Sequence, residues 1–256
     1  MKWLKGLGCG VLLLVVVSVI YVAVNDSGIV SVQYADSKNA DHQAIKTSLE
    51  AWGGFQLAAD DIDAVYMVPR DLQIAFMDCG EPSASYDPAQ TAILMCYELV
   101  NRLIRDYRRY AESDSVLAVS VWQTTLFVFY HELGHALIDM LDLPVTGREE
   151  DAVDQLATIV LLEAGPEGRD AALSGAEWFQ SQSRRTGSRA PFWDEHSLDQ
   201  QRYFNILCWV YGSDTTAHRA LLGRDWGLPA ARAERCPAEY DRMSRAWNSM
   251  LAPYKH

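Results

Sequence analysis

The sequence predicts an α+β fold in which a small sheet comes first and a mostly helical region follows. β-favouring stretches are confined to the first hundred residues, segments with helical character fill the rest, and no internal repeat divides the chain. About 230 residues follow an apolar N-terminal segment, and 49% of the chain is hydrophobic, which suits one domain with a sizeable core. We therefore expect a targeting segment at residues 1–25 and a single domain at residues 26–256.

The N-terminal segment has the length of a membrane span. Lys2 and Lys5 precede an apolar run at residues 6–24, which is about long enough to cross a bilayer. Bulky residues stand where a cleavage site needs small ones, so an uncleaved signal anchor is favoured over a cleaved secretory peptide. Because the lysines lie before the run and Asn25 and Asp26 lie after it, we expect the domain to be exported.

The cysteines agree with an exported domain. Apart from Cys9 there are four, Cys79, Cys96, Cys208 and Cys236, an even number as expected in an oxidising compartment. Proximity along the chain suggests Cys79 with Cys96 and Cys208 with Cys236, although four cysteines allow three pairings and buried free thiols are the alternative. No Cys-x-x-Cys spacing supports zinc binding by cysteine, and the net charge of −12 argues against a nucleic-acid partner.

The expected elements follow from β propensity, turn residues and helical character. The first part should contain a short helix at residues 42–52 and strands at 64–68, 72–77 and 91–96, the last after the Asp87-Pro88 turn. Helices should follow at residues 97–111, 115–141, 148–163, 198–211 and roughly 238–251. The Ser- and Arg-rich stretch 180–191 is expected to be a surface loop, with gating of a cleft as the alternative.

The third of these helices carries the most informative motif, His131-Glu132-Leu133-Gly134-His135. At 3.6 residues per turn, both imidazoles lie on one helix face and can reach one ion, whereas Glu132 lies about 100° away and is placed to hold a water. Besides Tyr130, residues 115–138 contain no other ionisable group. Burying two histidines and a glutamate there without a shared cation is costly, so we favour a metal site over hydrogen-bonded core histidines.

Catalytic zinc usually takes three protein ligands and leaves a position for water. The pattern His-Glu-x-x-His-x-x-Gly-x-x-His fails here because Ile138 and Leu141 replace its glycine and last histidine. The next helix instead places Glu150 and Asp154 one turn apart. We assign Glu150 as the third ligand and Asp154 as the acceptor of a ligand histidine's free N–H.

Other acidic residues of the same region compete for the ligand role. Glu149, Asp151 and Glu163 are alternatives, and the acidic residues of the first turn could simply favour the helix dipole. Between Glu149 and Glu150, only Glu150 has an acid four residues later, because the residue four after Glu149 is Val153.

This spacing resembles the gluzincin class of metallopeptidases, in which a Glu-x-x-x-Asp helix follows the His-Glu-x-x-His helix. More closely, the chain is similar to a bacterial domain-of-unknown-function family labelled as metallopeptidases, over roughly residues 40–250. The matching segments are residues 129–139, 147–155, 85–88, 95–99, 194–198 and 205–212. The resemblance implies a zincin-like fold and a peptidase acting on a peptide or protein. With a bacterial source, the anchor implies the inner membrane, with the domain facing the periplasm or cell exterior.

The resemblance also implies how the site would work. In zincin-like folds the strand before the active-site helix forms a cleft wall to which a peptide adds as a strand, and we assign residues 91–95 to that role as a hypothesis. Zn²⁺ held by His131, His135 and Glu150 would activate a water, with Glu132 as the general base. A further donor must stabilise the oxyanion.

The donor candidates are His196, Tyr203 and Tyr211. We favour His196 because a nearby acid could hold it protonated, although a plain histidine at a helix start is the alternative. His42, His218 and His256 have no supporting context and are expected at the surface.

Two other functions fit the same residues. A zinc hydrolase of non-peptide, cell-wall-type amides would share the site but need another cleft. A catalytically inactive metal-binding scaffold would not need to keep a base, so the presence of Glu132 argues against it.

Overall fold

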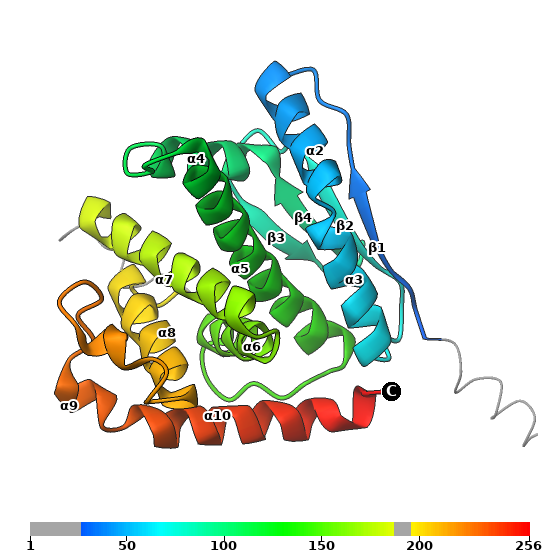
Figure 1. Cartoon of the computed structure of the whole chain (residues 1–256). Helices are drawn as coiled ribbons and strands as arrows, with labels where there is room; N and C mark the ends of the chain where they lie inside the picture. The colour runs from blue at the N-terminus through cyan, green and yellow to red at the C-terminus, as the bar shows by residue number, and fades with distance from the viewer. Residues whose placement is uncertain (1–26, 187–195) are drawn as a thin grey trace, which may run out of the picture.

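The computed structural model describes residues 27–186 and 196–256 and shows an α+β architecture (Figure 1). The elements run in the order β1 (Val30–Tyr34), α2 (Ala40–Trp52), α3 (Gly54–Val65), β2 (Leu72–Met77), β3 (Ala84–Asp87), β4 (Ala92–Cys96), α4 (Tyr97–Tyr107), α5 (Asp114–Met140), α6 (Glu149–Glu163), α7 (Pro166–Thr186), α8 (Asp199–Ser213), α9 (Ala230–Ala233) and α10 (Cys236–Leu251). The sheet lies in the N-terminal part and a mostly helical region follows, as predicted. The expected anchor at residues 1–25 lies outside the described residues, and no helix within them has the length and apolar character of a membrane span.

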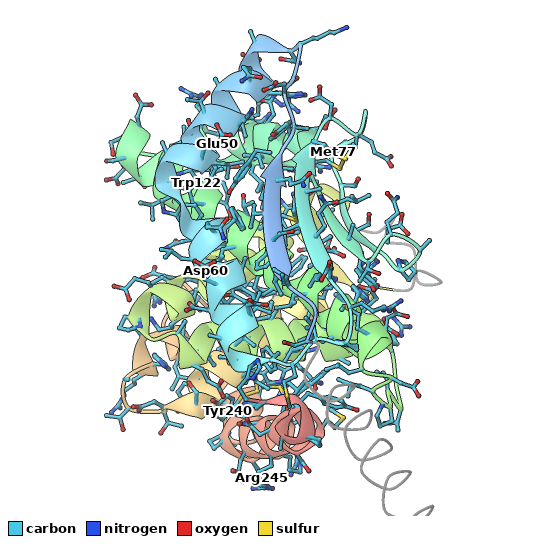
Figure 2. The ribbon with its side chains drawn as sticks, turned by 90° about the vertical axis from the view of Figure 1, so that its right-hand side faces the viewer. Glu50, Asp60, Met77, Trp122, Tyr240 and Arg245 are labelled. Atoms are coloured by element: carbon cyan, nitrogen blue, oxygen red, sulfur yellow. A yellow bond between two sulfur atoms is a disulfide. The ribbon has the colours of Figure 1, made fainter. Side chains whose placement is uncertain are left out.

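The sheet is mixed and has four strands in the order β1-β2-β4-β3. β1, β2 and β4 are parallel, and β3 is antiparallel to β4 at the edge. Parallel neighbours need a crossover connection, and α2 and α3 supply it between β1 and β2. Seen from the side, these two helices lie along one face of the sheet, while α10 lies at the bottom of the view, below the end of α3 (Figure 2).

Our hypothesis that residues 91–95 form the open cleft wall is wrong. β4 covers these positions from Ala92 onward and has a hydrogen-bonded partner on both edges, so no peptide can add to it. The edge on this side of the sheet belongs to β3, which the sequence did not reveal because the segment Ala-Ser-Tyr-Asp carries no β-branched residue.

Two further expectations need correction, and some elements were not anticipated. The strand expected at residues 64–68 is instead the end of α3 and a loop, where Tyr66 makes only an isolated bridge with Lys255. β1 was not anticipated, and neither was α7, whose Gly168 and Gly175 lower helix propensity. A Cβ at Gly175 would lie 2.4 Å from the Phe127 ring, so this glycine serves the packing of α7 on α5. Because α7 ends at Thr186, residues 180–186 belong to a helix and not to the expected loop. Residues 187–191 lie outside the described residues.

The helices that carry the motifs lie where the sequence predicted them. α5 begins after Ser113, whose side chain accepts the N–H of Val116 as an N-cap. It packs against α4, α6, α7 and the sheet, so it lies in the middle of the core. At the crossing with α6, a Cβ on Gly134 would approach Val153 Cβ to 2.7 Å. The missing side chain thus allows α6 to lie directly against the motif.

Two disulfides join neighbouring elements of the fold. Cys79 is bonded to Cys96, which ties the loop after β2 to the end of β4, and Cys208 is bonded to Cys236, which ties α8 to α10. These are the pairs that sequence proximity suggested.

Candidate metal centre

The α5 motif and the first turn of α6 meet at one point. His131, His135 and Glu150 each offer a ligand atom, and these atoms all lie within 4.8 Å of one another. His131 Nε2 lies 3.1 Å from Glu150 Oε2, and His135 Nε2 lies 3.4 Å from Glu150 Oε1. Ligand atoms about 2.1 Å from a tetrahedral ion are about 3.4 Å apart. The spacing of these atoms is therefore that of a metal ligand set.

One atom of the group indicates that these contacts are not ordinary hydrogen bonds. Among the described residues, Glu150 Oε2 is buried and has no partner of acceptable hydrogen-bond geometry, although His131 Nε2 and His196 Nε2 lie within 3.1 Å of it. A buried carboxylate oxygen without a partner costs about 1 to 3 kcal/mol or more. A cation between the oxygen and the imidazole nitrogens would remove this cost, so the residues present fit a bound metal.

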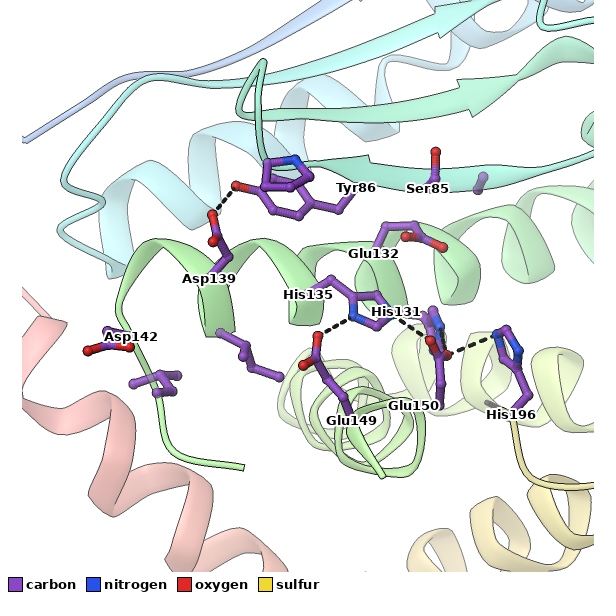
Figure 3. Close-up of a pocket in the computed structure, with 14 residues that line it drawn as sticks. Ser85, Tyr86, His131, Glu132, His135, Asp139, Asp142, Glu149, Glu150 and His196 are labelled. Atoms are coloured by element: carbon purple, nitrogen blue, oxygen red, sulfur yellow. Dashed lines mark hydrogen bonds and ion pairs between the residues drawn. The ribbon is translucent and has the colours of Figure 1, made fainter. Parts of the chain in front are cut away.

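The other ring nitrogens are held by carboxylates. His131 Nδ1 lies 2.8 Å from Asp154 Oδ1, and His135 Nδ1 lies 2.8 Å from Glu149 Oε1 (Figure 3). An ionised carboxylate only accepts, so each Nδ1 carries the proton and donates it. Each Nε2 is then the nitrogen that faces the common centre and could bind an ion after giving up any proton that it carries.

The pKa shifts reflect this concentration of charge. Burial alone would lower the pKa of His135, but Glu150 and Glu149 raise it to about 9. Burial would raise the pKa of Glu150, but the three imidazoles of His131, His135 and His196 hold it well below its usual range. Both directions show that the site stabilises positive charge beside a carboxylate that stays ionised.

Glu132 has a different environment from Glu150. It is 7% exposed, and burial raises its pKa, an effect that the two motif histidines and the backbone N–H of Tyr86 partly offset. A carboxylate with a raised pKa is a better proton acceptor near neutral pH than an exposed one. Glu132 is outside the ligand group, as the 100° offset along the helix predicted.

A pocket of about 640 Å³ opens onto the group. β3 contributes Ser85 and Tyr86 to its lining, α5 contributes Glu132 and Asp139, and α6 contributes Glu149 (Figure 3). The hydroxyl of Tyr86 donates to Asp139 Oδ2 at 2.8 Å, which joins the edge strand to α5. The pocket therefore lies between the edge strand and the helix that carries the motif.

The candidates for a further donor are not equivalent. His196 lines the pocket, and its Nε2 lies 2.9 Å from Glu150 Oε2. Tyr203 is buried and donates its hydroxyl to the carbonyl of Trp226, and neither it nor Tyr211 lines the pocket. The structure thus brings His196 to the site and leaves the two tyrosines away from it.

His42 is not a surface residue, contrary to expectation. It is 6% exposed and forms a group with Asp78 and Glu98 that could also hold a metal. However, the Asp78 oxygens contact His42 Nδ1 and the hydroxyl of Ser37, and Glu98 accepts the N–H groups of Cys79 and Gly80. Because these carboxylate oxygens already have partners, this group needs no ion.

Sequence reasoning missed two functional contacts. Glu149 was considered only as a competing ligand, whereas it holds the second motif histidine. Arg202 was not singled out, although its guanidinium contacts Asp154, the carboxylate that holds the first motif histidine, His131. Glu149 could have been identified because it directly precedes Glu150 in the sequence, whereas no local pattern distinguishes Arg202.

The comparisons with known proteins agree with this geometry. A family model described as “Putative metallopeptidase” matches residues 34–251, which is most of the chain. No curated protein and no solved structure matches it. The chain therefore belongs to this family of metallopeptidases.

Proposed function

We propose that the protein is a zinc-dependent metallopeptidase in which His131, His135 and Glu150 hold the ion and Glu132 is the general base. One observation carries the proposal: three ligand atoms from two helices converge beside a pocket, and both imidazoles are oriented by carboxylates at the opposite nitrogen. Two nitrogens and one carboxylate oxygen are a donor set that suits zinc. When bound, such an ion acts as a Lewis acid that activates water and polarises a carbonyl.

The residues of the chain would then move the protons. Glu132 accepts a proton from the attacking water and delivers it to the leaving amine. Its raised pKa and its contact with the backbone N–H of Tyr86 support this role, because they keep a basic carboxylate in one place. His196 is the proposed donor to the developing oxyanion, and Arg148 supports it by donating to the His196 carbonyl at 3.2 Å.

A peptide is the substrate that the pocket wall favours. β3 pairs with β4 on one side only, and Ala84, Ser85 and Tyr86 line the pocket. An extended peptide can add to such an edge through its backbone hydrogen bonds. An amide outside an extended peptide lacks the regular series of N–H and C=O groups that this pairing needs. This argument favours a peptide over a cell-wall-type amide, and a zincin-like mode of binding belongs to the same proposal.

We further propose that the domain works outside the cytoplasm. The two disulfides support this location because structural disulfides persist in oxidising compartments. The N-terminal apolar run is the proposed route of export and membrane attachment.

Replacement of the base tests the function. The wild-type protein should contain about one zinc per chain and hydrolyse an unfolded protein substrate. Glu132→Gln should retain the metal while turnover falls by about 10² to 10⁴-fold, because only the proton acceptor is lost. Metal content by mass spectrometry and release of peptides measure the two properties.

The matched control is Glu163→Gln, which changes an exposed glutamate at the end of α6. It should leave both properties unchanged. Activity of Glu132→Gln equal to that of the wild type would reject the base, and a wild-type protein without affinity for zinc would reject the whole proposal. Turnover of cell-wall amides without turnover of peptides would favour the alternative hydrolase.

A further inference from the structure

A buried arginine lies directly behind one of the two ligand histidines. Arg202 of α8 is 8% exposed, and Asp154 of α6 is 2% exposed. Arg202 Nε donates to Asp154 Oδ2 at 2.7 Å, and Nη2 donates to Oδ1 at 2.7 Å. Both carboxylate oxygens are therefore held by one planar group, and the plane of the carboxylate is fixed.

The same carboxylate oxygen orients the ligand. Asp154 Oδ1 accepts both Arg202 Nη2 and His131 Nδ1, and Nη2 itself lies 3.4 Å from that Nδ1. Any rotation of the carboxylate would therefore turn the His131 ring and move its Nε2. The guanidinium is held in turn, because it stacks on the Phe179 ring of α7 with 3.8 Å between Cζ and the ring centroid.

The other ligand histidine has no such support. Its partner Glu149 is 47% exposed, and no arginine or lysine contacts that carboxylate in the described part of the chain. A buried carboxylate without a paired cation is costly, whereas an exposed one is stabilised by water. The two histidines thus differ in how rigidly they are held.

We propose that Arg202 is a positioning residue of the metal centre, which holds Asp154 so that His131 presents Nε2 to the ion. The inference rests on the proposed metal-dependent function. Arginine is needed because its fork bonds both carboxylate oxygens at once, whereas a lysine ammonium offers a single point charge. Arg202 does not line the pocket and would act through Asp154.

Arg202→Lys tests the inference, since it keeps the charge and removes the fork. Affinity for zinc should fall by about 10 to 100-fold, as is typical when a ligand's outer partner is lost. The absorption spectrum of the cobalt(II) form should change, because it reports the geometry of the ligands. Circular dichroism of the metal-free protein should stay like that of the wild type. The matched control is Arg232→Lys, which changes a partly buried arginine 2.7 Å from Glu239 and away from the pocket.

A double-mutant cycle separates positioning from general damage. In an Asp154→Asn background, Arg202→Lys should weaken zinc binding no further, because Arg202 then has no carboxylate to orient. If Arg202→Lys does not fold, Asp154→Asn with Arg202→Met removes both charges, and an affinity equal to that of Asp154→Asn supports the same conclusion.

Wild-type affinity and an unchanged cobalt spectrum in Arg202→Lys would overturn the inference and leave the proposed function intact. Losses of zinc affinity that add in the double-mutant cycle would also overturn the inference. Wild-type zinc affinity in the Asp154→Asn, Arg202→Met variant would overturn it as well. A wild-type protein that binds no zinc would overturn both.

Discussion

At the scale of residues, each of the two motif histidines contacts a different kind of carboxylate. Asp154 is buried and paired with an arginine, whereas Glu149 lies at the pocket rim with nearly half of its side chain exposed. Water can replace an exposed acceptor but has no access to a buried one. The two carboxylates should therefore contribute unequally to metal binding, although both contact Nδ1 at 2.8 Å.

This difference predicts the effect of Glu149→Gln. The amide can still accept the His135 N–H, and water is nearby, so affinity for zinc should fall by about tenfold or less, at the low end for such partners. Competition with a chromophoric chelator measures the affinity. Asp154→Asn should lose more, and a larger loss in Glu149→Gln than in Asp154→Asn would contradict the argument.

At the scale of elements, the site depends on how closely α6 approaches α5. Gly134 lies between the two histidines of the motif, and Val153 lies between Glu150 and Asp154. Contact at this pair therefore places the carboxylates of α6 opposite the imidazoles of α5. Since Val153 is β-branched and fully buried, it has little freedom to move away.

Gly134→Ala should separate the two helices. The added Cβ would lie 2.7 Å from Val153 Cβ, an overlap that typically costs about 1 to 3 kcal/mol, while helix propensity returns about 1 kcal/mol. Urea unfolding of the metal-free protein should show lower stability, and zinc affinity should fall with it.

Val153→Gly supplies the control for this prediction. In combination with Gly134→Ala it removes both Cβ and Cγ1 and leaves Cα 3.1 Å from the added methyl, so it should restore part of the lost zinc affinity. Unchanged affinity in Gly134→Ala alone would mean that the helix approach does not position the ligands.

At the scale of the whole molecule, the ligands join two central helices. α5 contacts the sheet, α4, α6 and α7, and α6 also contacts α8. An ion bound between α5 and α6 would therefore stabilise the folded state as a unit. Neither disulfide includes a residue of the proposed ligand group.

Removal of metal with a chelator should accordingly lower the melting temperature. An ion present at about 100 times its dissociation constant stabilises the native state by about 2.7 kcal/mol, which corresponds to about 5 to 10 °C for a chain of this length. Calorimetry without reductant measures the shift. His131→Ala should melt at one temperature with and without zinc, and a wild-type protein that behaves in the same way would contradict the prediction.

Patterns within single segments were sufficient to identify much of the site. The 3.6-residue period places His131 and His135 on one face, and the four-residue spacing of Glu150 and Asp154 does the same on the next helix. The strand at residues 72–77 and the helices at 148–163 and 97–111 were likewise recognisable from local composition. In each case the residues that favour the structure lie close together in the sequence, within a few positions of one another.

Contacts between distant segments determined the rest. β3 is a strand because β4 lies beside it, and α7 forms despite its glycines because Gly175 fits against Phe127. Arg202 is one of 22 lysines and arginines, and nothing near it in the chain distinguishes it. Its role arises because folding brings it, 48 residues further along, to a buried carboxylate that needs a cation. The ligand motifs are thus local properties of two helices, whereas the edge strand and the buried arginine depend on burial and pairing that exist only once the chain is folded.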